Sequence, residues 1–159
     1  MKREPPYKIG LISTHGTGKT TLAYELAGEF KKRGFTVKVI SEVAGDAFEE
    51  GIPINENTNL PAQLYVLLRH MAEEQKAVAR NFDMIISDRS VYDNWVYLER
   101  KCGDHPFILD FIFNYVQKFP YSALYKLPLV GELQADGVRD AVNKDFQEDV
   151  FSRLTYFLN

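Results

Sequence analysis

The octapeptide Ser-Thr-His-Gly-Thr-Gly-Lys-Thr at residues 13–20 limits what this chain can fold into more than any other feature. It lies between a short apolar run, residues 9–12, and an amphipathic stretch that begins at Thr21. A strand, a glycine-rich turn and a helix in this order bind phosphate, because backbone N–H groups of the turn and the positive end of the helix dipole converge on one anion. Gly16 and Gly18 have no Cβ and allow the tight curve. The sequence therefore predicts a phosphate-binding loop.

The loop also predicts individual roles. Lys19 would reach the β- and γ-phosphates, and the Thr20 hydroxyl would ligate Mg²⁺. The usual pattern begins with glycine, whereas this chain has Ser13, which predicts a loop start that does not need a positive φ. The alternative is an ordinary glycine-rich turn between a strand and a helix. The residues expected to contact the nucleotide are Ser13, Thr14, His15, Gly16, Thr17, Gly18, Lys19, Thr20 and Thr21.

Composition favours one domain over residues 1–159, with 45% hydrophobic residues for a core. The net charge of −3 and the lack of a basic stripe argue against nucleic acid as the main partner. We expect no membrane segment and no signal peptide, and the single Cys102 fits a reducing cytoplasm. The three histidines and one cysteine do not have zinc-site spacing. A homodimer is left open.

Apolar periodicity predicts strands at 8–12, 35–40, 84–86 and 122–127. Helices are predicted after the loop to residue 33, over 61–80, 91–102 and 106–119, and from 142 to 158, with a helical turn near 44–50. Strands that alternate with helices predict an α/β fold of three layers, in which a short, mainly parallel sheet has helices on both faces. About four strands are expected, with a fifth left open. Residues 128–140 are polar and resemble a lid.

In open parallel sheets, ligands bind beyond the carboxyl ends of the strands. The second strand is followed by Glu42, a candidate general base, and the third by Asp88 and Arg89. Asp88 could accept a hydrogen bond from Thr20 or from a water on Mg²⁺, and Arg89 could neutralise a phosphoryl group or hold the acceptor. Each has a plainer interpretation. Glu42 could be a solvated loop residue, Asp88 an acid at a helix N-terminus, and Arg89 a surface arginine.

Three further residues are candidates for binding or closure. Gln63 and Arg69, on the predicted helix 61–80, could line an acceptor pocket. Arg139, in the polar segment before the last helix, could close over the phosphates and exclude water, or could follow a turn built around Gly137. Aromatic residues at helical spacing could line the same pocket, although their spacing favours core packing: Tyr65, Tyr92 and Trp95.

Taken together, these motifs resemble P-loop small-molecule kinases. The closest resemblance is to thymidylate and deoxynucleoside kinases and to ribosylnicotinamide-kinase-type domains linked to NAD metabolism. It rests on residues 13–21, on Glu42, and on Asp-Arg-Ser at 88–90. It also rests on Ala-Gln-Leu-Tyr at 62–65 with Arg69, and on Asp-Gly-Val-Arg at 136–139.

The resemblance implies ATP and Mg²⁺ as cofactors, with the γ-phosphoryl group transferred to a small nucleoside- or nucleotide-like acceptor. It further implies Glu42 or Asp88 as base, Thr20 and Asp88 at the metal, Arg89 holding the acceptor, and Arg139 as lid cation. The fold of these kinases usually continues into a fifth strand after the last helix, where this chain ends at Asn159.

Other classes of P-loop protein fit less well. A regulatory GTPase should carry Asp-x-x-Gly after the third strand, and no aspartate in the chain lies three residues before a glycine. An oligomeric ATPase motor should carry paired acids after that strand, whereas Asp88 is followed by Arg89. A simple ATPase, or a nucleotide-binding module without turnover, needs only Lys19 and Thr20 and stays open.

Overall fold

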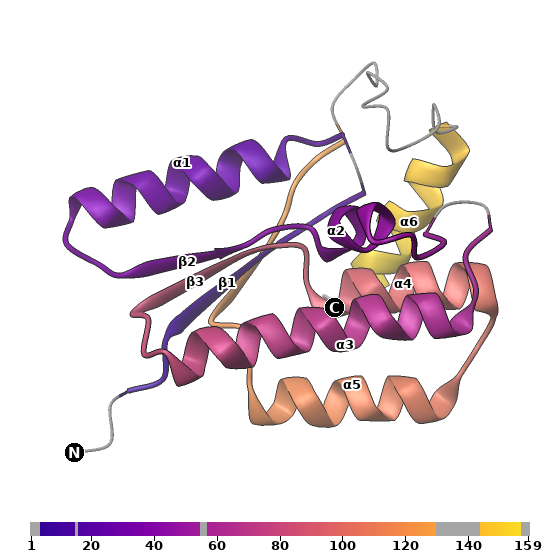
Figure 1. Ribbon diagram of the computed structural model, residues 1–159. Helices are drawn as coiled ribbons and strands as arrows, with labels where there is room; N and C mark the ends of the chain where they lie inside the picture. The colour runs from indigo at the N-terminus through magenta and orange to yellow at the C-terminus, as the bar shows by residue number, and fades with distance from the viewer. Residues whose placement is uncertain (1–3, 15, 55–56, 130–143, 157–159) are drawn as a thin grey trace.

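The structure, a computed structural model, describes residues 4–14, 16–54, 57–129 and 144–156. The elements, in chain order, are β1 (Tyr7–Ile12), α1 (Lys19–Lys32), β2 (Val37–Ile40), α2 (Val43–Glu49), α3 (Leu60–Ala79), β3 (Met84–Asp88), α4 (Val91–Cys102), α5 (Pro106–Lys118), β4 (Ala123–Lys126) and α6 (Lys144–Tyr156). Figure 1 shows α1 on one side of the sheet and α3, α4 and α5 on the other.

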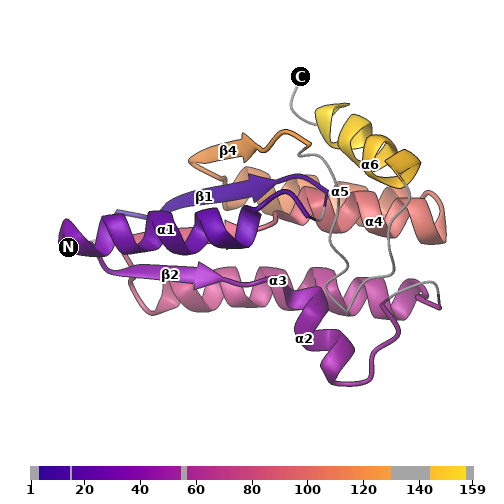
Figure 2. The same cartoon turned by 90° about the horizontal axis from the view of Figure 1, so that it is seen from above.

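The four strands form one parallel sheet in the order β2-β3-β1-β4. The arrows of β1, β2 and β4 run the same way when the molecule is seen from above (Figure 2). Leu11 of β1 is opposite Asp88 of β3, and Ile40 of β2 is opposite Ser87. The carboxyl ends of the three strands therefore lie together at one edge of the sheet.

Alternating side chains of each strand point to opposite faces, so each face has its own core. Ile9, Leu11 and Ile86 pack with Ala23 and Ala27 of α1 on one face. On the other face, Ile40 and Ile85 pack against Ala77 of α3. Small alanines on α1 and α3 let the helix backbones approach the sheet closely. This packing fixes the start of α1 over the edge where the phosphate loop leaves β1.

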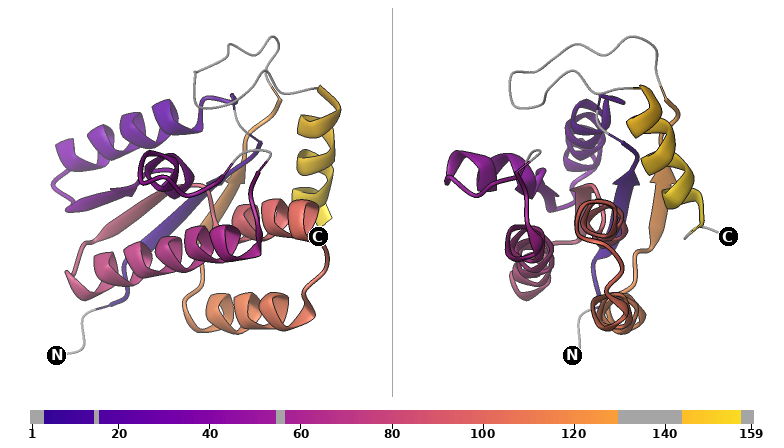
Figure 3. Two further views of the ribbon diagram at one scale, coloured as in Figure 1. Left: turned by 45° about the vertical axis from the view of Figure 1, so that its right-hand side comes forward. Right: turned by 90° about the vertical axis from the view of Figure 1, so that its right-hand side faces the viewer.

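A larger cluster joins the helices beneath the sheet. Trp95 and Leu98 of α4 pack with Leu67 of α3, Ile112 of α5 and Leu154 of α6. Figure 3 shows α6 beside β4, where Lys126 donates a hydrogen bond to Thr155. The fold thereby anchors α4 from several sides, which matters because α4 begins directly beside the phosphate loop.

The predicted α/β class, with its parallel sheet of four strands and helices on both faces, is confirmed. Two boundaries differ: α1 begins at Lys19 rather than near Thr21, and residues 43–49 form a full helix, α2, instead of a single turn. His15, Arg139 and most of the lid-like segment lie outside the described residues. Within the described part of the chain, no helix is both long and apolar enough to cross a membrane.

Candidate functional site

The phosphate loop has the backbone that its sequence predicts. Gly16 and Gly18 adopt φ angles of 71° and 79°, in the left-handed region that glycine enters without steric cost. Gly18 is the N-cap of α1, and a Cβ added there would meet nothing within 4 Å, so its conformation rather than the available space requires glycine. The loop therefore turns directly into the first residue of α1.

Lys19 folds back over this loop. Its Nζ donates hydrogen bonds to the Thr14 carbonyl and, at 3.2 Å, to Thr17 Oγ1, and the residue is only 5% exposed. Burial, together with the nearby Arg89 charge, lowers the pKa of Lys19 to about 8, although surrounding carboxylates oppose the shift. The ammonium is thus held by neutral oxygens of the loop itself. An incoming phosphate would add negative charge directly beside this ammonium.

Asp88 connects the third strand to the same loop. The Thr20 hydroxyl donates a hydrogen bond to Asp88 Oδ2, whereas Asp88 Oδ1 is buried without a hydrogen-bond partner. Asp88 is 2% exposed. A hydroxyl and a carboxylate at the phosphate loop suit Mg²⁺, which takes oxygen ligands and usually relies on only one or two carboxylates. Thr20 and Asp88 therefore fit the predicted metal position.

Glu42 and Arg89 form an ion pair beside this position. Glu42 precedes α2 but does not use its side chain to cap it. Its Oε1 lies 2.8 Å from Nη2 of Arg89, which is 5% exposed and has its guanidinium 4.8 Å from the centre of the Tyr97 ring. Burial alone would lower the pKa of Arg89, but Glu42, Tyr97 and Asp93 raise it well above its ordinary value. The arginine therefore stays charged beneath the surface.

Arg89 adopts an unusual backbone conformation to reach this place. Its φ is 111°, a region that residues with a Cβ rarely occupy. Its N–H donates to the Leu11 carbonyl at 3.1 Å, which continues the pairing of β3 with β1 for one more residue. Strained residues persist where the surroundings fix them, and they cluster at functional sites. The conformation supports a functional role for Arg89 over the surface arginine considered above.

Ser13, which replaces the usual glycine, connects three elements. Its N–H donates to Asp93 Oδ1 at 3.3 Å, and its Oγ donates to the Leu127 carbonyl beyond β4 at 3.1 Å. Only Asn81 and Arg89 among the described non-glycine residues have a positive φ, so Ser13 has an ordinary backbone as predicted. A glycine at this position could not make the bond to Leu127.

Unmet hydrogen-bonding capacity gathers at this edge of the sheet. In the described part of the chain, four buried side-chain atoms have no partner: Thr14 Oγ1, Asp88 Oδ1, Arg89 Nε and Asn94 Nδ2. Buried polar atoms in native proteins are nearly always paired. All four belong to the phosphate loop or to residues 88–94, which is the pattern expected where a polar ligand completes the bonds. Asn94 was not predicted, because a single asparagine in a helix carries no recognisable motif.

Two of the three residues predicted to bind the acceptor, Gln63 and Arg69, belong to α3. Gln63 is 6% exposed and donates to Thr58 Oγ1 at 2.8 Å. Arg69 instead pairs at 2.6 Å with Glu50, just after α2, and at 3.7 Å with Asp46. Acids of α2 and of the residue after it therefore hold Arg69 in this structure. Six residues along an α-helix place the side chains of Gln63 and Arg69 on different faces.

The other predicted residues on the helices are Thr21 and two aromatic residues. Thr21 is an exposed residue in the first turn of α1. Trp95 is 1% exposed within the core between the helices, and Tyr65 is partly exposed and donates to Glu50 at 2.7 Å. For these two aromatic residues, the structure agrees with core packing and surface bonding and not with a stacking pocket.

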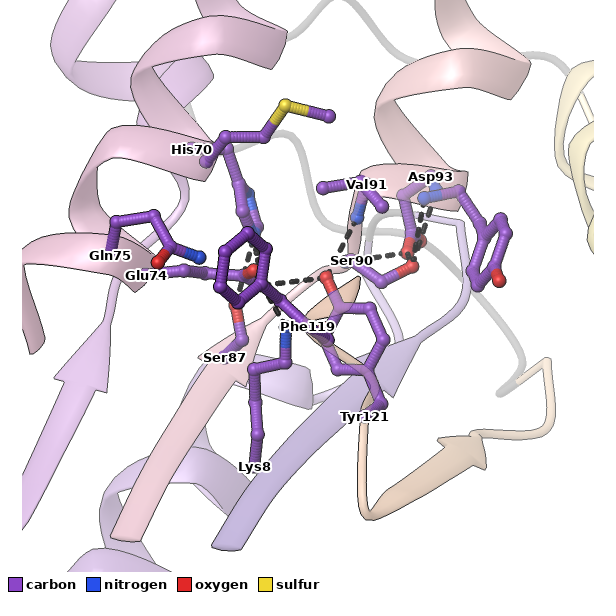
Figure 4. A network of polar contacts seen from close by, with 12 residues as sticks. Lys8, His70, Glu74, Gln75, Ser87, Ser90, Val91, Asp93, Phe119 and Tyr121 are labelled. Carbon is purple, nitrogen blue, oxygen red and sulfur yellow. Dashed lines mark hydrogen bonds and ion pairs between the residues drawn. The ribbon is translucent and has the colours of Figure 1, made fainter. Parts of the chain in front are cut away.

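A second polar cluster lies between β1 and α3 (Figure 4). Its centre is Glu74 of α3, which is fully buried and accepts from Lys8 at 2.8 Å, Tyr115 at 2.7 Å and Tyr121 at 2.6 Å. Burial alone would raise the pKa of Glu74, but the His70 ring and the Lys8 ammonium together lower it to about 2. The cluster is therefore a compensated buried charge pair.

Comparison with known families adds to this geometry. Residues 8–159 match the family model described as "AAA domain". The chain belongs to this family. The match places the phosphate loop in a P-loop domain of the AAA type, and it supports nucleotide binding for the chain as a whole.

Two curated proteins match over part of the chain. One is the UDP-N-acetylmuramoyl-L-alanyl-D-glutamate--2,6-diaminopimelate ligase of Phocaeicola vulgatus, which is 40% identical over 72 residues, 45% of this chain and 15% of the ligase. The ligase of the same name from Bacteroides fragilis is 39% identical over 71 residues, 44% of this chain and 15% of that protein. The match thus spans about 15% of the length of these relatives.

Proposed function

We propose that the chain is an ATP- and Mg²⁺-dependent phosphotransferase that moves the γ-phosphoryl group to a hydroxyl or phosphate of a small nucleoside- or nucleotide-like acceptor. The observation that carries the transferase part is the 2.8 Å ion pair beside the phosphate loop between Glu42, which is partly exposed, and the buried Arg89. A module that only binds nucleotide needs Lys19 and Thr20 but has no need for a charged pair at the end of the second and third strands.

Each residue has a role in this proposal. Loop amides and Lys19 bind the β- and γ-phosphates, and Thr20 and Asp88 hold Mg²⁺, which neutralises phosphate charge when bound. The oxygen of the acceptor hydroxyl bonds to the γ-phosphorus while Glu42 takes the hydroxyl proton. The bond between the γ-phosphorus and the oxygen that bridges it to the β-phosphate breaks in the same step. Arg89 steadies Glu42 and offsets the negative charge of the transferring group.

Two buried donors beyond β3 could bind the acceptor. Arg89 Nε and Asn94 Nδ2 are buried donors without partners, and they lie close along the chain beyond β3. Oxygen atoms of an acceptor could accept from both. Gln63 keeps its proposed place at the inward side of α3, whereas Arg69 holds α2 against α3 through Glu50 and Asp46.

Labelled ATP with a panel of nucleosides and nucleotides tests this function. Transfer of label to one acceptor class supports the phosphotransferase. Release of phosphate alone would mean an ATPase, and binding without either product would mean a nucleotide-binding module; both results contradict the proposal. A variant that replaces Glu42 with glutamine should lose label transfer and keep ATP binding.

A further inference from the structure

Asp93 is fully buried at the start of α4 and uses both carboxylate oxygens. Oδ2 accepts from the Ser90 N–H and from the Ser90 hydroxyl, each at 2.7 Å, which closes the capping box of the helix (Figure 4). Oδ1 accepts from the Ser13 N–H at 3.3 Å. The two bonds to Ser90 are local, whereas the bond to Ser13 joins residues 80 positions apart in sequence.

We propose that Asp93 is a positioning residue that fixes the start of the phosphate loop relative to the segment carrying Asp88 and Arg89. Ser13 is the first residue of the loop, and Ser90 directly follows Arg89. One carboxylate therefore ties both segments to the same rigid helix. This inference rests on the proposed function only for its consequence for nucleotide binding; the bond between the segments is a property of the protein alone.

A helix cap by itself does not account for this arrangement. The Ser90 hydroxyl already accepts from the N–H groups of Tyr92 and Asp93, so α4 has its own N-terminal cap. The contact with Ser13 satisfies no donor of α4. It acts instead on a loop whose donors must converge on phosphate, where misplacement of about 1 Å can cost about a hundredfold in rate.

The anchor is rigid because α4 is held on several sides. Trp95 and Leu98, on the turns after Asp93, are buried against α3, α5 and α6. The Val91 N–H donates to the Tyr121 hydroxyl at 3.0 Å, and Tyr121 in turn donates to Glu74. The second polar cluster thereby holds the residue that begins α4. Asp93 extends this support to the loop.

An Asp93→Asn variant separates the two roles. The asparagine amide has one carbonyl oxygen, which accepts, and one NH₂ group, which only donates. Whichever of Ser90 and Ser13 lies opposite the NH₂ group therefore loses its acceptor. It can serve Ser90 or Ser13 but not both. Ser90→Ala is the matched control, because it loses the capping hydroxyl and leaves the bond between Asp93 and Ser13 in place.

Hydrogen exchange of backbone amides in the nucleotide-free protein, resolved by NMR, tests the proposal. In Asp93→Asn we expect the amides of Ser13, Thr14 and Thr17 to exchange about tenfold faster than in wild type, through local opening of the loop. In Ser90→Ala only amides at the start of α4 should exchange faster. Equal loop exchange in the wild type and both variants would overturn the proposal. If Asp93→Asn does not fold, Asp93→Ser replaces it in the same comparison.

ATP affinity, measured by calorimetry with Mg²⁺, gives the functional consequence. At equal loss of thermal stability, Asp93→Asn should bind ATP about tenfold more weakly than Ser90→Ala. Equal affinities in the two variants would show that Asp93 serves α4 alone. A wild-type protein that does not bind ATP would refute the proposed function, while the exchange result would still decide whether Asp93 positions the loop.

Discussion

Thr20 and Asp88 are 68 positions apart, yet the Thr20 hydroxyl donates a hydrogen bond to Asp88 Oδ2. The bond joins the first turn of α1 to the carboxyl end of β3, and it leaves Asp88 Oδ1 buried and without a partner. A cation beside the phosphates would find one hydroxyl oxygen and one carboxylate already assembled. This relationship connects the phosphate loop to the rest of the site.

The first prediction concerns Asp88. Asp88→Asn removes the charge that would attract Mg²⁺ but keeps the shape of the side chain. ATP affinity in the presence of Mg²⁺ should fall about tenfold, with little change when EDTA is present, because only the metal-dependent part depends on the carboxylate. Calorimetric titrations with and without Mg²⁺ make the comparison.

Asp83→Asn is the matched control for this experiment. Asp83 lies just before the same strand at its opposite end, where it accepts from the Thr36 N–H at 2.7 Å. Its substitution should alter stability and leave the Mg²⁺ dependence of binding unchanged. Equal Mg²⁺ dependence in Asp88→Asn and wild type would remove Asp88 from the metal position.

Much of this fold follows from local sequence patterns. The phosphate loop, the apolar strands and the helices on either side were predicted because each has a short-range signal: glycines at fixed spacing, alternation, or a helical period. The capping box that joins Ser90 and Asp93 also has a short-range signal, a serine followed three residues later by an acid, and it is present. Residues 43–49 were underestimated, since a seven-residue helix gives too few turns for a clear period.

The polar contacts between distant elements could not be predicted in this way. The ion pair between Lys8 and Glu74 forms because β1 and α3 meet in the fold. The residues next to Lys8 in the sequence give no pattern that predicts a buried charge. The bond from Ser13 to Asp93 has the same origin. The ion pair between Arg69 and Glu50 is another contact between distant elements that no local pattern predicts.

The second prediction concerns the proposed base. Glu42→Gln keeps a hydrogen-bond acceptor near Arg89 but cannot take a proton. The rate of phosphoryl transfer should fall by about 10²–10⁴-fold, the usual contribution of a general base. ATP affinity should stay near the wild-type value, because in the proposed function Glu42 acts on the acceptor hydroxyl and does not bind the phosphates. Single-turnover transfer and calorimetry measure the two quantities separately.

Glu50→Gln provides the comparison for Glu42. Glu50 also pairs with an arginine of the neighbouring segment, Arg69, but it is substantially exposed and lies at the other end of α2. Its loss should leave transfer unchanged. A Glu42→Gln protein with the wild-type transfer rate would exclude Glu42 as the base and turn attention to Asp88.

The third prediction concerns stability at low pH. Because the pKa of Glu74 is lowered to about 2 in the folded protein, its charge stabilises the fold above the ordinary pKa near 4.5. That contribution should be lost progressively as the pH falls from about 4.5 toward 2, and the shift corresponds to an amount on the order of 3 kcal/mol. Urea unfolding across this pH range measures the loss.

Glu74→Gln should flatten this pH dependence, since the substituted side chain does not titrate. Glu73→Gln is the control next to it, because Glu73 pairs at 3.3 Å with Lys76, which is largely exposed. That variant should retain the wild-type slope. Identical slopes in the two variants would show that Glu74 is not the group responsible.

In the proposed function, Lys19 is the cation of the phosphate-binding loop, and nucleotide binding by this protein depends on it. The decisive measurement is calorimetric titration of ATP with Mg²⁺ into wild type and Lys19→Ala, with circular dichroism to show that the variant is folded. We predict measurable binding to the wild type and a loss of at least about a hundredfold in the variant, about 3 kcal/mol of binding free energy. The same affinity in a folded Lys19→Ala protein would contradict the central claim.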